Sequence, residues 1–141
     1  MKKRVVITGM GVISPVGTGI NAFWDALVKG RSGIGPISRF DASDLPTRIA
    51  GEVKDFDPMQ YLDKKEARRM DRFTQFALCA TQMALADAGL NVDNVDRERL
   101  GVVLGTGIGG TQTFEDQHRV LLERGPSRVS PFFVPMMIAN L

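Results

Sequence analysis

The most informative segment of the sequence is Val5-Val6-Ile7-Thr8-Gly9-Met10-Gly11-Val12-Ile13-Ser14-Pro15-Val16-Gly17. Its first part is apolar and β-branched, which predicts a short buried strand over residues 4–8. The glycines and the Ser14-Pro15 pair then predict a turn. Glycines also interrupt the apolar run after the basic start, and no small-x-small cleavage site follows it, so a secretory signal is not expected.

Helices and strands alternate along the rest of the chain. Helices are predicted over residues 21–29, 64–88, 114–123 and 130–138, strands over 49–53 and 100–105, and a loop over 30–48. Asn21 is the expected N-cap of the first helix, and Gly30 its end. Asp63 and Glu66 form a predicted capping box for the long helix, which Gly89 stops. This alternation predicts an α/β layered fold.

Composition places the chain among ordinary globular proteins. It has 141 residues, 43% of them apolar and 24% charged, with a net charge of +2. The charge is too small to predict nucleic-acid binding, and no apolar stretch approaches the ~20 residues of a membrane helix. A single cysteine excludes an internal disulfide and fits a reducing compartment, so a cytoplasmic location is expected.

The last residues give no signal for the end of a domain. The sequence ends on Met-Met-Ile-Ala-Asn-Leu, with no glycine, charged last turn or polar tail. Residues 1–141 are therefore expected to be the N-terminal part of a longer domain.

The run Gly105-Thr106-Gly107-Ile108-Gly109-Gly110 matches the pattern G-x-G-x-x-G after a predicted strand. In dinucleotide sites such glycines let a pyrophosphate approach a helix N-terminus. However, the acidic residue expected about 20 positions later on a second strand is missing, because Glu123 falls within a predicted helix. A tight turn between strand and helix, or a turn that also lines a substrate channel, remain as alternatives.

Basic residues cluster at the start of the long helix. Lys65, Arg68, Arg69 and Arg72 follow helical spacing, which predicts one positive stripe. Such a stripe suits an acidic protein or a phosphate group, although a solvated helix face is the more common explanation. Nucleic acid is less expected, since no basic patch with interleaved aromatic residues appears.

Two reactive residue types occur once each. Cys79 is predicted in mid-helix, away from the helix N-termini and cations that lower a thiol pKa, so a buried core role is expected. Glu115 and His118 have the E-x-x-H spacing of half a carboxylate metal site. Without a second half, no metal site is predicted, and a single histidine supports no catalytic triad.

An ordered series of motifs resembles the β-ketoacyl-acyl-carrier-protein synthase family over the whole chain. The motifs are residues 5–11 (VVITGMG), 14–17 (SPVG), 23–24 (FW), 30–33 (GRSG), 68–73 (RRMDRF), 87–90 (DAGL), 105–107 (GTG) and 130–135 (SPFFVP). The nearest resemblance is to the elongating type II synthase of bacterial fatty acid synthesis.

The resemblance implies a thiolase-like fold of two similar α/β halves, each a mixed sheet between helices, with this chain as most of the first half. It also implies an acyltransferase: malonyl on acyl carrier protein condenses with a cysteine-bound acyl group, carbon dioxide is lost, and a 3-oxoacyl product forms. The family's nucleophilic cysteine, two histidines and lysine fall beyond Leu141. No catalytic residue is thus expected in this chain, which is expected to be inactive alone.

The resemblance also assigns supporting residues. Lys65, Arg68 and Arg69 match the helix that binds the acidic carrier protein, Ile108 matches a residue of the acyl pocket, and Phe133 matches one near the dimer interface that contributes to that pocket. It implies acyl and malonyl thioesters as substrates and a homodimer, and neither a metal nor another cofactor.

Other functions remain as alternatives. Within the family these are a polyketide-type ketosynthase or its chain-length partner. Outside it they are a non-catalytic module that binds a carrier protein, and a dinucleotide-binding protein.

Overall fold

The computed structural model describes residues 3–139, which form two compact units. The first contains the described residues through Asp57 together with Ala80–Leu90, and the second contains Pro58–Cys79 together with the described residues from Asn91 onward. The helix α3 (Arg72–Asp87) therefore contributes residues to both units. No helix among residues 3–139 has the length and apolar character needed to cross a membrane.

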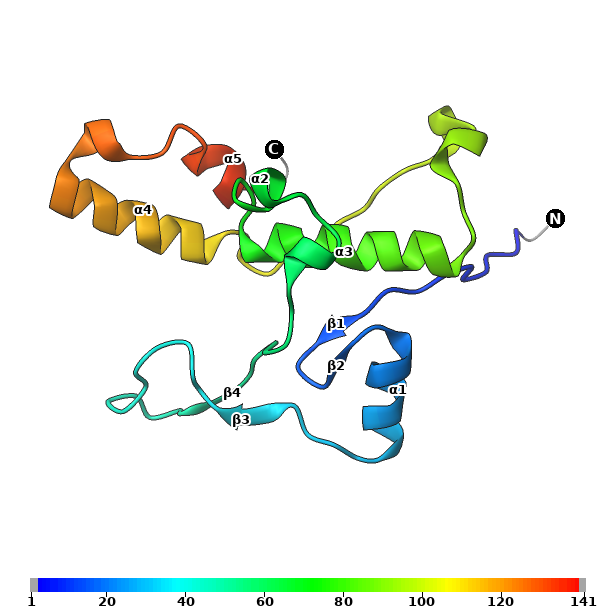
Figure 1. Ribbon diagram of the computed structural model, residues 1–141, viewed down its shortest axis with the longest axis horizontal. Helices are drawn as coiled ribbons and strands as arrows, with labels where there is room; N and C mark the ends of the chain where they lie inside the picture. The colour runs from blue at the N-terminus through cyan, green and yellow to red at the C-terminus, as the bar shows by residue number, and fades with distance from the viewer. Residues whose placement is uncertain (1–2, 140–141) are drawn as a thin grey trace. The chain divides into compact units, whose positions relative to one another are not determined.

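The first unit contains two small antiparallel hairpins, one complete helix and the last part of α3 (Figure 1). The strand β1 (Ile13–Ser14) pairs with β2 (Gly17–Thr18), so the glycine-rich segment does turn as the sequence predicts. The hydroxyl of Ser14 donates to the carbonyl of Gly17 at 3.0 Å and closes this turn. The second hairpin joins β3 (Ile34–Pro36) to β4 (Ile49–Gly51).

The helix α1 (Ile20–Val28) follows β2 directly. Its N-cap is Gly19, with φ of 84°, and not the predicted Asn21. The reason is that the Gly19 N–H donates to the Val12 carbonyl at 2.8 Å while its own carbonyl accepts from Phe23, so the hairpin itself starts the helix. The predicted end is confirmed, because Gly30 takes a left-handed φ of 62° just beyond the helix.

The opening segment packs its glycines on α3. A Cβ at Gly9 or Gly11 would overlap the backbone carbonyls of Ala84 and Ala80, so only glycine allows this approach. The N–H of Met10, between the two glycines, donates to the Asp87 carboxylate at 2.9 Å.

The second unit is mainly helical. Its helices are α2 (Lys64–Ala67), the start of α3, α4 (Thr111–Arg124) and α5 (Phe133–Met137), with short 3₁₀ turns η1 (Pro58–Gln60), η2 (Val92–Asn94), η3 (Arg97–Arg99) and η4 (Pro126–Arg128). α4 packs against α5 and η4 (Figure 1). The Gly110 N–H at the start of α4 donates to the Met137 carbonyl of α5 at 2.8 Å.

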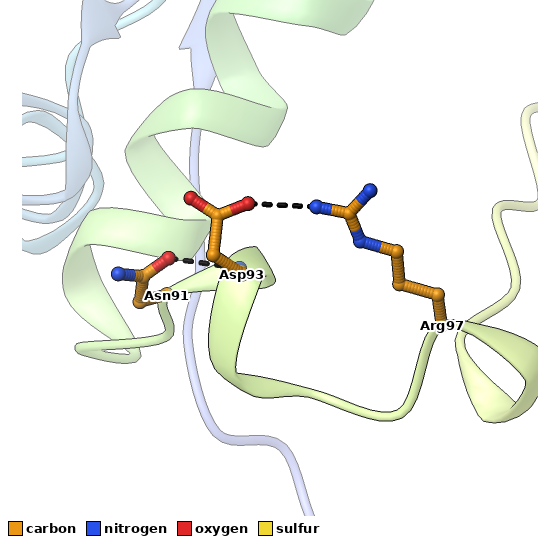
Figure 2. A network of polar contacts seen from close by, with 3 residues as sticks. All are labelled: Asn91, Asp93 and Arg97. Atoms are coloured by element: carbon orange, nitrogen blue, oxygen red, sulfur yellow. Dashed lines mark hydrogen bonds and ion pairs between the residues drawn. The ribbon is translucent and has the colours of Figure 1, made fainter.

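Exposed polar contacts order the segment after α3. Figure 2 shows the Asn91 side chain accepting from the Asp93 N–H at 2.9 Å, which caps η2. Asp93 also pairs with Arg97 at 2.7 Å. Because both charged side chains of the pair are 73% exposed, this contact adds little stability and mainly shapes the turn.

Several element predictions are confirmed. Strand 49–53 appears as β4, and α4 covers the predicted helix 114–123 but begins at Thr111; Gly125 ends it with φ of 81°. The final helix is shorter than predicted, as α5 contains only Phe133–Met137. The predicted loop over residues 30–48 was wrong at one place, because β3 forms there by pairing with β4.

The strands predicted over residues 4–8 and 100–105 are wrong for the described chain. Both segments lie outside its two sheets, and Val5 and Val103 are 91% and 101% exposed. A buried strand needs hydrogen-bonded neighbours on its edges, and the pairings of the described residues give these segments none. Their apolar, β-branched composition thus predicts burial that this chain does not itself provide.

The single helix predicted over residues 64–88 was also wrong, because it breaks into α2 and α3 at residues 68–71. Asp71 causes the break, since its carboxylate accepts from the Phe73 N–H at 3.4 Å and acts as a new N-cap. Gln75 satisfies the end of α2, as its Nε2 donates to the carbonyls of Ala67 and Met70 at 2.9 and 3.3 Å. Gly89, with φ of 59°, ends α3 as predicted.

The buried apolar side chains are few and mostly small. Among the described residues they are Ala26, Ala42, Phe56, Leu62, Ala67 and Cys79.

Candidate functional site

Three cations gather beside α2. Lys65, Arg68 and Arg69, all exposed, line a depression of about 360 Å³ together with Asp63 and Lys64. We call Lys65, Arg68 and Arg69 the basic surface. Four positive groups line this depression with one carboxylate, and Glu66 lines an adjoining depression with Lys65 and Arg69. The balance stays positive, which favours an acidic ligand here.

Local capping builds the basic surface. The Asp63 carboxylate accepts from the Lys65 N–H at 2.7 Å, which confirms Asp63 as the N-cap of α2. Arg68 is the C-cap residue, and Arg69 follows in the turn before α3. The surface is therefore made by a short helix and its closing turn, not by one long helix face.

The predicted four-residue stripe was wrong at Arg72. Its guanidinium lies 4.8 Å from the centre of the Phe76 ring, a cation–π contact on α3. Because the helix breaks between Ala67 and Arg72, helical spacing no longer aligns Arg72 with the basic surface.

Arg69 has a second contact that sequence reasoning missed. Its guanidinium lies 4.8 Å from the centre of the Phe132 ring, the N-cap residue of α5. The contact joins the basic surface to α5 within the second unit. Nothing in the sequence signals it, because the two residues are far apart along the chain.

An apolar cavity lies where α4 begins. Its volume is about 200 Å³, and it is lined by Ile108, Gly110, Thr111, Phe114 and Met137. Phe133 backs this lining, since its ring centre is 6.2 Å from that of Phe114. Of the two residues of the predicted pocket, Ile108 therefore lines the cavity itself, and Phe133 lies against its lining residue Phe114.

The four glycines before α4 differ in whether the described chain requires glycine at their positions. Gly109 has φ of 79°, and a Cβ on Gly110 would lie 2.7 Å from the Met136 carbonyl. These two positions need glycine, as a tight turn before a helix predicts. A Cβ on Gly105 or Gly107 would meet open space, so neither is fixed by packing within the described chain.

The isolated cysteine is not poised as a nucleophile. Cys79 is 0% exposed, and desolvation raises the pKa of its thiol. The thiol therefore stays protonated at neutral pH, which agrees with the predicted core role.

His118 lies on the exposed side of α4. Its ring stacks on Phe114 with centres 6.1 Å apart, and Glu115 pairs with Arg119 at 3.2 Å. Within residues 3–139 no cluster of three or more histidine, cysteine or carboxylate side chains has metal-binding geometry.

Sequence reasoning missed several residues of the cavity. Thr111 and Phe114 follow the glycine turn at i, i+3 spacing, a signal that was lost because the helix was predicted to begin at residue 114. Met137 enters through the packing of α5 on α4, which no local pattern predicts.

Comparison with known proteins shows the family to which this chain belongs. The family model described as "Beta-ketoacyl synthase, N-terminal domain" matches residues 2–141. The 3-oxoacyl-[acyl-carrier-protein] synthase 2 of Synechocystis sp. is 57% identical over 140 residues, which cover 99% of this chain and 34% of that protein.

Two solved structures share the fold. The ishigamide ketosynthase/chain length factor superposes with a TM-score of 0.84 at 34% identity, covering 95% of this chain and 34% of that one. A type II PKS ketosynthase bound to the hexaketide, solved in complex with its acyl-carrier protein (AntDE:AntF), gives a TM-score of 0.76 at 26% identity and covers 97% and 35%.

The chain spans about a third of the length of these relatives. Its fold is the thiolase-like α/β fold of the ketosynthases, as the sequence predicts. With a family model matching residues 2–141 and 57% identity to a curated member, the chain belongs to the β-ketoacyl synthase family, in the N-terminal domain of that family.

Proposed function

We propose that the full-length protein containing this chain is an elongating condensing enzyme of fatty acid synthesis, a 3-oxoacyl-acyl-carrier-protein synthase. The observation that carries the proposal is the 57% identity, over 99% of the chain, to a protein named for that activity. Residues 1–141 form the N-terminal part of its synthase domain and precede the nucleophile.

The proposed reaction is a decarboxylative condensation, which needs neither an oxidant nor a reductant. Malonyl on the carrier protein loses carbon dioxide, and the resulting carbanion attacks the carbonyl carbon of an acyl group held on a cysteine. The cysteine leaves as thiolate, and a 3-oxoacyl carrier protein forms. The chain's own thiol does not replace that cysteine, since Cys79 is buried and protonated, so residues 1–141 alone are expected to be inactive.

In this proposal the basic surface binds the acyl carrier protein. Carrier proteins are acidic, and the three exposed cations Lys65, Arg68 and Arg69 give a positive site for them. A related ketosynthase was solved in complex with its acyl-carrier protein, which supports a carrier as the partner.

The cavity before α4 takes part of the acyl chain. Its lining from Ile108, Phe114 and Met137 is apolar, and Phe133 supports the Phe114 ring. Each methylene that enters such a lining gains ~0.8 kcal/mol by leaving water. Among the described residues of this lining, Thr111 supplies the one polar side chain, and none supplies a cation for a phosphate group.

A polyketide-type ketosynthase or chain-length partner is the second candidate. It is favoured by the fold shared with the ishigamide ketosynthase/chain length factor at 34% identity. The two candidates differ in the acyl donor that the full-length protein accepts, saturated or poly-keto, and a chain-length partner lacks the active cysteine. A non-catalytic carrier-binding module is the outcome if binding occurs without product.

We further propose that the full-length protein acts as a cytoplasmic homodimer. A homodimer is what the resemblance to the family implies, and exposed apolar side chains such as that of Trp24, which is 64% exposed, leave surface for a second copy to cover. Light scattering of the purified full-length protein tests this, since a monomer would contradict it.

The experiment that tests the function uses the full-length protein with an acyl donor and malonyl carrier protein. Mass spectrometry of the carrier is expected to show the 3-oxoacyl product, and replacing malonyl carrier by unloaded carrier is the control. Binding without any product would leave only the non-catalytic module.

The docking assignment is tested by reversing charge on the basic surface. Replacing Lys65, Arg68 and Arg69 by Glu is expected to weaken carrier binding at low salt by at least about tenfold, and high salt should reduce the difference. The control reverses three exposed arginines elsewhere in the same unit, Arg99, Arg124 and Arg128. Equal carrier affinity of the two variants would reject the basic surface as the dock.

A further inference from the structure

Asp71 is a buried carboxylate that contacts the first turns of two helices. Only 7% of the residue is exposed. One oxygen, Oδ1, accepts from the Phe73 N–H at the start of α3 at 3.4 Å. The other, Oδ2, accepts from both the N–H and the hydroxyl of Thr113 in α4, at 2.9 and 2.6 Å.

This geometry lets one side chain serve two helix N-termini. The first N–H groups of a helix have no partner within the helix and carry partial positive charge. A carboxylate between two such ends is stabilised by both, which offsets the cost of its burial. Because Asp71 and Thr113 are 42 positions apart, the contact fixes α4 relative to the start of α3 within the second unit.

The start of α4 is held on its other side by α5. The Gly110 N–H donates to the Met137 carbonyl, and a Cβ on Gly110 would lie 3.1 Å from Asp71 Oδ2 and 2.7 Å from the Met136 carbonyl. The first turn of α4 thus lies between the Asp71 carboxylate and the backbone of α5, with no room for a side chain at position 110.

That turn forms the wall of the apolar cavity. Thr111 and Phe114, which flank Thr113 in the sequence, both line the cavity. Gly110 lines it at the start of the helix. In the other direction along the chain, Asp71 follows Arg69 of the basic surface by two residues.

We propose that Asp71, through Thr113, is a positioning residue that fixes the wall of the acyl cavity relative to the basic surface and so determines which acyl-chain lengths are accepted. The inference rests on the proposed function for its substrate, and on the hydrogen bonds of Asp71 for its mechanism. A merely structural role would lower activity equally for every acyl chain.

The test uses Thr113→Val in the full-length protein, because it removes the hydroxyl donor and keeps the side-chain shape. Without substrate, hydrogen exchange of the amides at residues 111–114 is expected to accelerate. The ratio of kcat/KM for long against short acyl chains is expected to change by about tenfold, the effect of losing a hydrogen bond to a charged group. Carrier affinity should stay within about twofold of the wild-type value, since the basic surface is untouched.

Conservative and control variants separate positioning from general damage. Thr113→Ser restores the hydroxyl and should return the chain-length ratio toward wild type. Thr47→Val makes the same chemical change at an exposed threonine of the other unit and should change neither readout. Asp71→Asn keeps the shape and one carbonyl oxygen, so it provides a milder disruption if Thr113→Val does not fold.

An equal loss of activity for all chain lengths, or an unchanged exchange rate at residues 111–114, would overturn the proposal. The proposed function fails separately, if the wild-type protein makes no 3-oxoacyl product. In that case, hydrogen exchange in Thr113→Val and Asp71→Asn still decides whether Asp71 holds α4.

Discussion

Ile108 is an exposed apolar residue that also lines the cavity, so it bears directly on which acyl chains the proposed enzyme accepts. It is 84% exposed in the described chain, and it lines the cavity together with Met137. Covering this apolar surface with an apolar partner is favourable, at roughly 25 cal/mol per Å² removed from water. In the proposed function, the acyl chain is that cover.

Ile108→Phe is therefore expected to shift the preferred substrate of the full-length protein toward shorter acyl chains. The larger ring occupies volume in a cavity of about 200 Å³, so the optimum should fall by about two methylenes or more, each worth ~0.8 kcal/mol. The measurement is kcat/KM across a series of acyl carrier proteins of increasing chain length.

Leu122→Phe provides the matched control, because Leu122 is 72% exposed on α4 and does not line the cavity. A chain-length profile that stays the same in Ile108→Phe would remove Ile108 from the acyl pocket.

The hairpin of β3 and β4 is an element whose closure depends on a carboxylate. Glu52, just after β4, accepts from the Ser38 hydroxyl at 2.6 Å and from the Ser38 and Arg39 N–H groups at 3.1 and 3.2 Å. The hydrogen bonds of Ser38, its hydroxyl foremost, lower the pKa of Glu52 below its ordinary value. The folded hairpin thus prefers the charged form.

The sign of the pH dependence follows from this preference. Because the pKa of Glu52 is lower in the folded hairpin than in an unfolded one, the stabilisation is present above the ordinary carboxyl pKa and is lost as the pH falls through the lowered value. The amides of Ser38 and Arg39 are expected to lose protection, beyond the intrinsic effect of pH on exchange, as Glu52 is protonated.

Glu52→Gln should lower the protection of the Ser38 and Arg39 amides at neutral pH, and it should remove the additional loss of protection that acid causes in the wild type. The measurement is hydrogen exchange of the two amides as a function of pH, after correction for intrinsic rates. An identical pH profile in the wild type and in Glu52→Gln would show that Glu52 does not close the hairpin.

The break between α2 and α3 shapes the basic surface. Gln75 donates to the carbonyls of Ala67 and Met70, so it holds the last turn of α2 against α3. Gln75→Leu leaves two carbonyls without this donor. Exchange at the amides of residues 67–70 is expected to accelerate by about tenfold, and carrier binding should weaken as the turn carrying Arg68 and Arg69 loosens.

Gln112→Leu is the control, since Gln112 makes only an exposed contact to Asp116 at 3.2 Å among the contacts described here. Unchanged exchange at residues 67–70 in Gln75→Leu would mean that the α2 turn holds its shape without this side chain.

Local patterns predicted the elements whose causes are local. The positions of α1, β4 and most of α4 follow from apolar spacing and from glycines at the helix ends. The break at residues 68–71 has a local part, since Asp71 caps α3 through the Phe73 N–H, and a distant part that no local pattern predicts, since Thr113, 42 positions away, holds the other oxygen of the carboxylate. Likewise, three of the four basic residues were grouped correctly, while Arg72 was misplaced by the assumption of a continuous helix.

The 141-residue chain as a whole leaves many of its large apolar side chains exposed. Residues 4–8 and 100–105 have the composition of buried strands, yet Val5, Ile7 and Val102 are 83–91% exposed. The chain spans about a third of the length of its relatives, so the sequence predicts strands whose neighbours these residues alone do not provide. The thiolase-like fold was recognised from the order of the motifs, and the strand pairing was not.

In the full-length protein, both segments are expected to join a sheet. Their backbone N–H groups would then be paired, and their amides should exchange far more slowly than in the isolated 141-residue chain. Comparing hydrogen exchange of residues 4–8 and 100–105 in the two proteins tests this. Equal, fast exchange in both would contradict burial of these segments in a common sheet.

In the proposed function, the full-length protein condenses malonyl with an acyl group while the basic surface holds the carrier protein. The most direct measurement compares the rate of 3-oxoacyl formation from malonyl carrier protein and from malonyl pantetheine, in the wild type and in the Lys65, Arg68 and Arg69 to Glu variant. We predict that charge reversal lowers the carrier-dependent rate by at least about tenfold and leaves the pantetheine rate unchanged. No product from the wild type, or the same carrier-dependent rate in both proteins, would contradict the account.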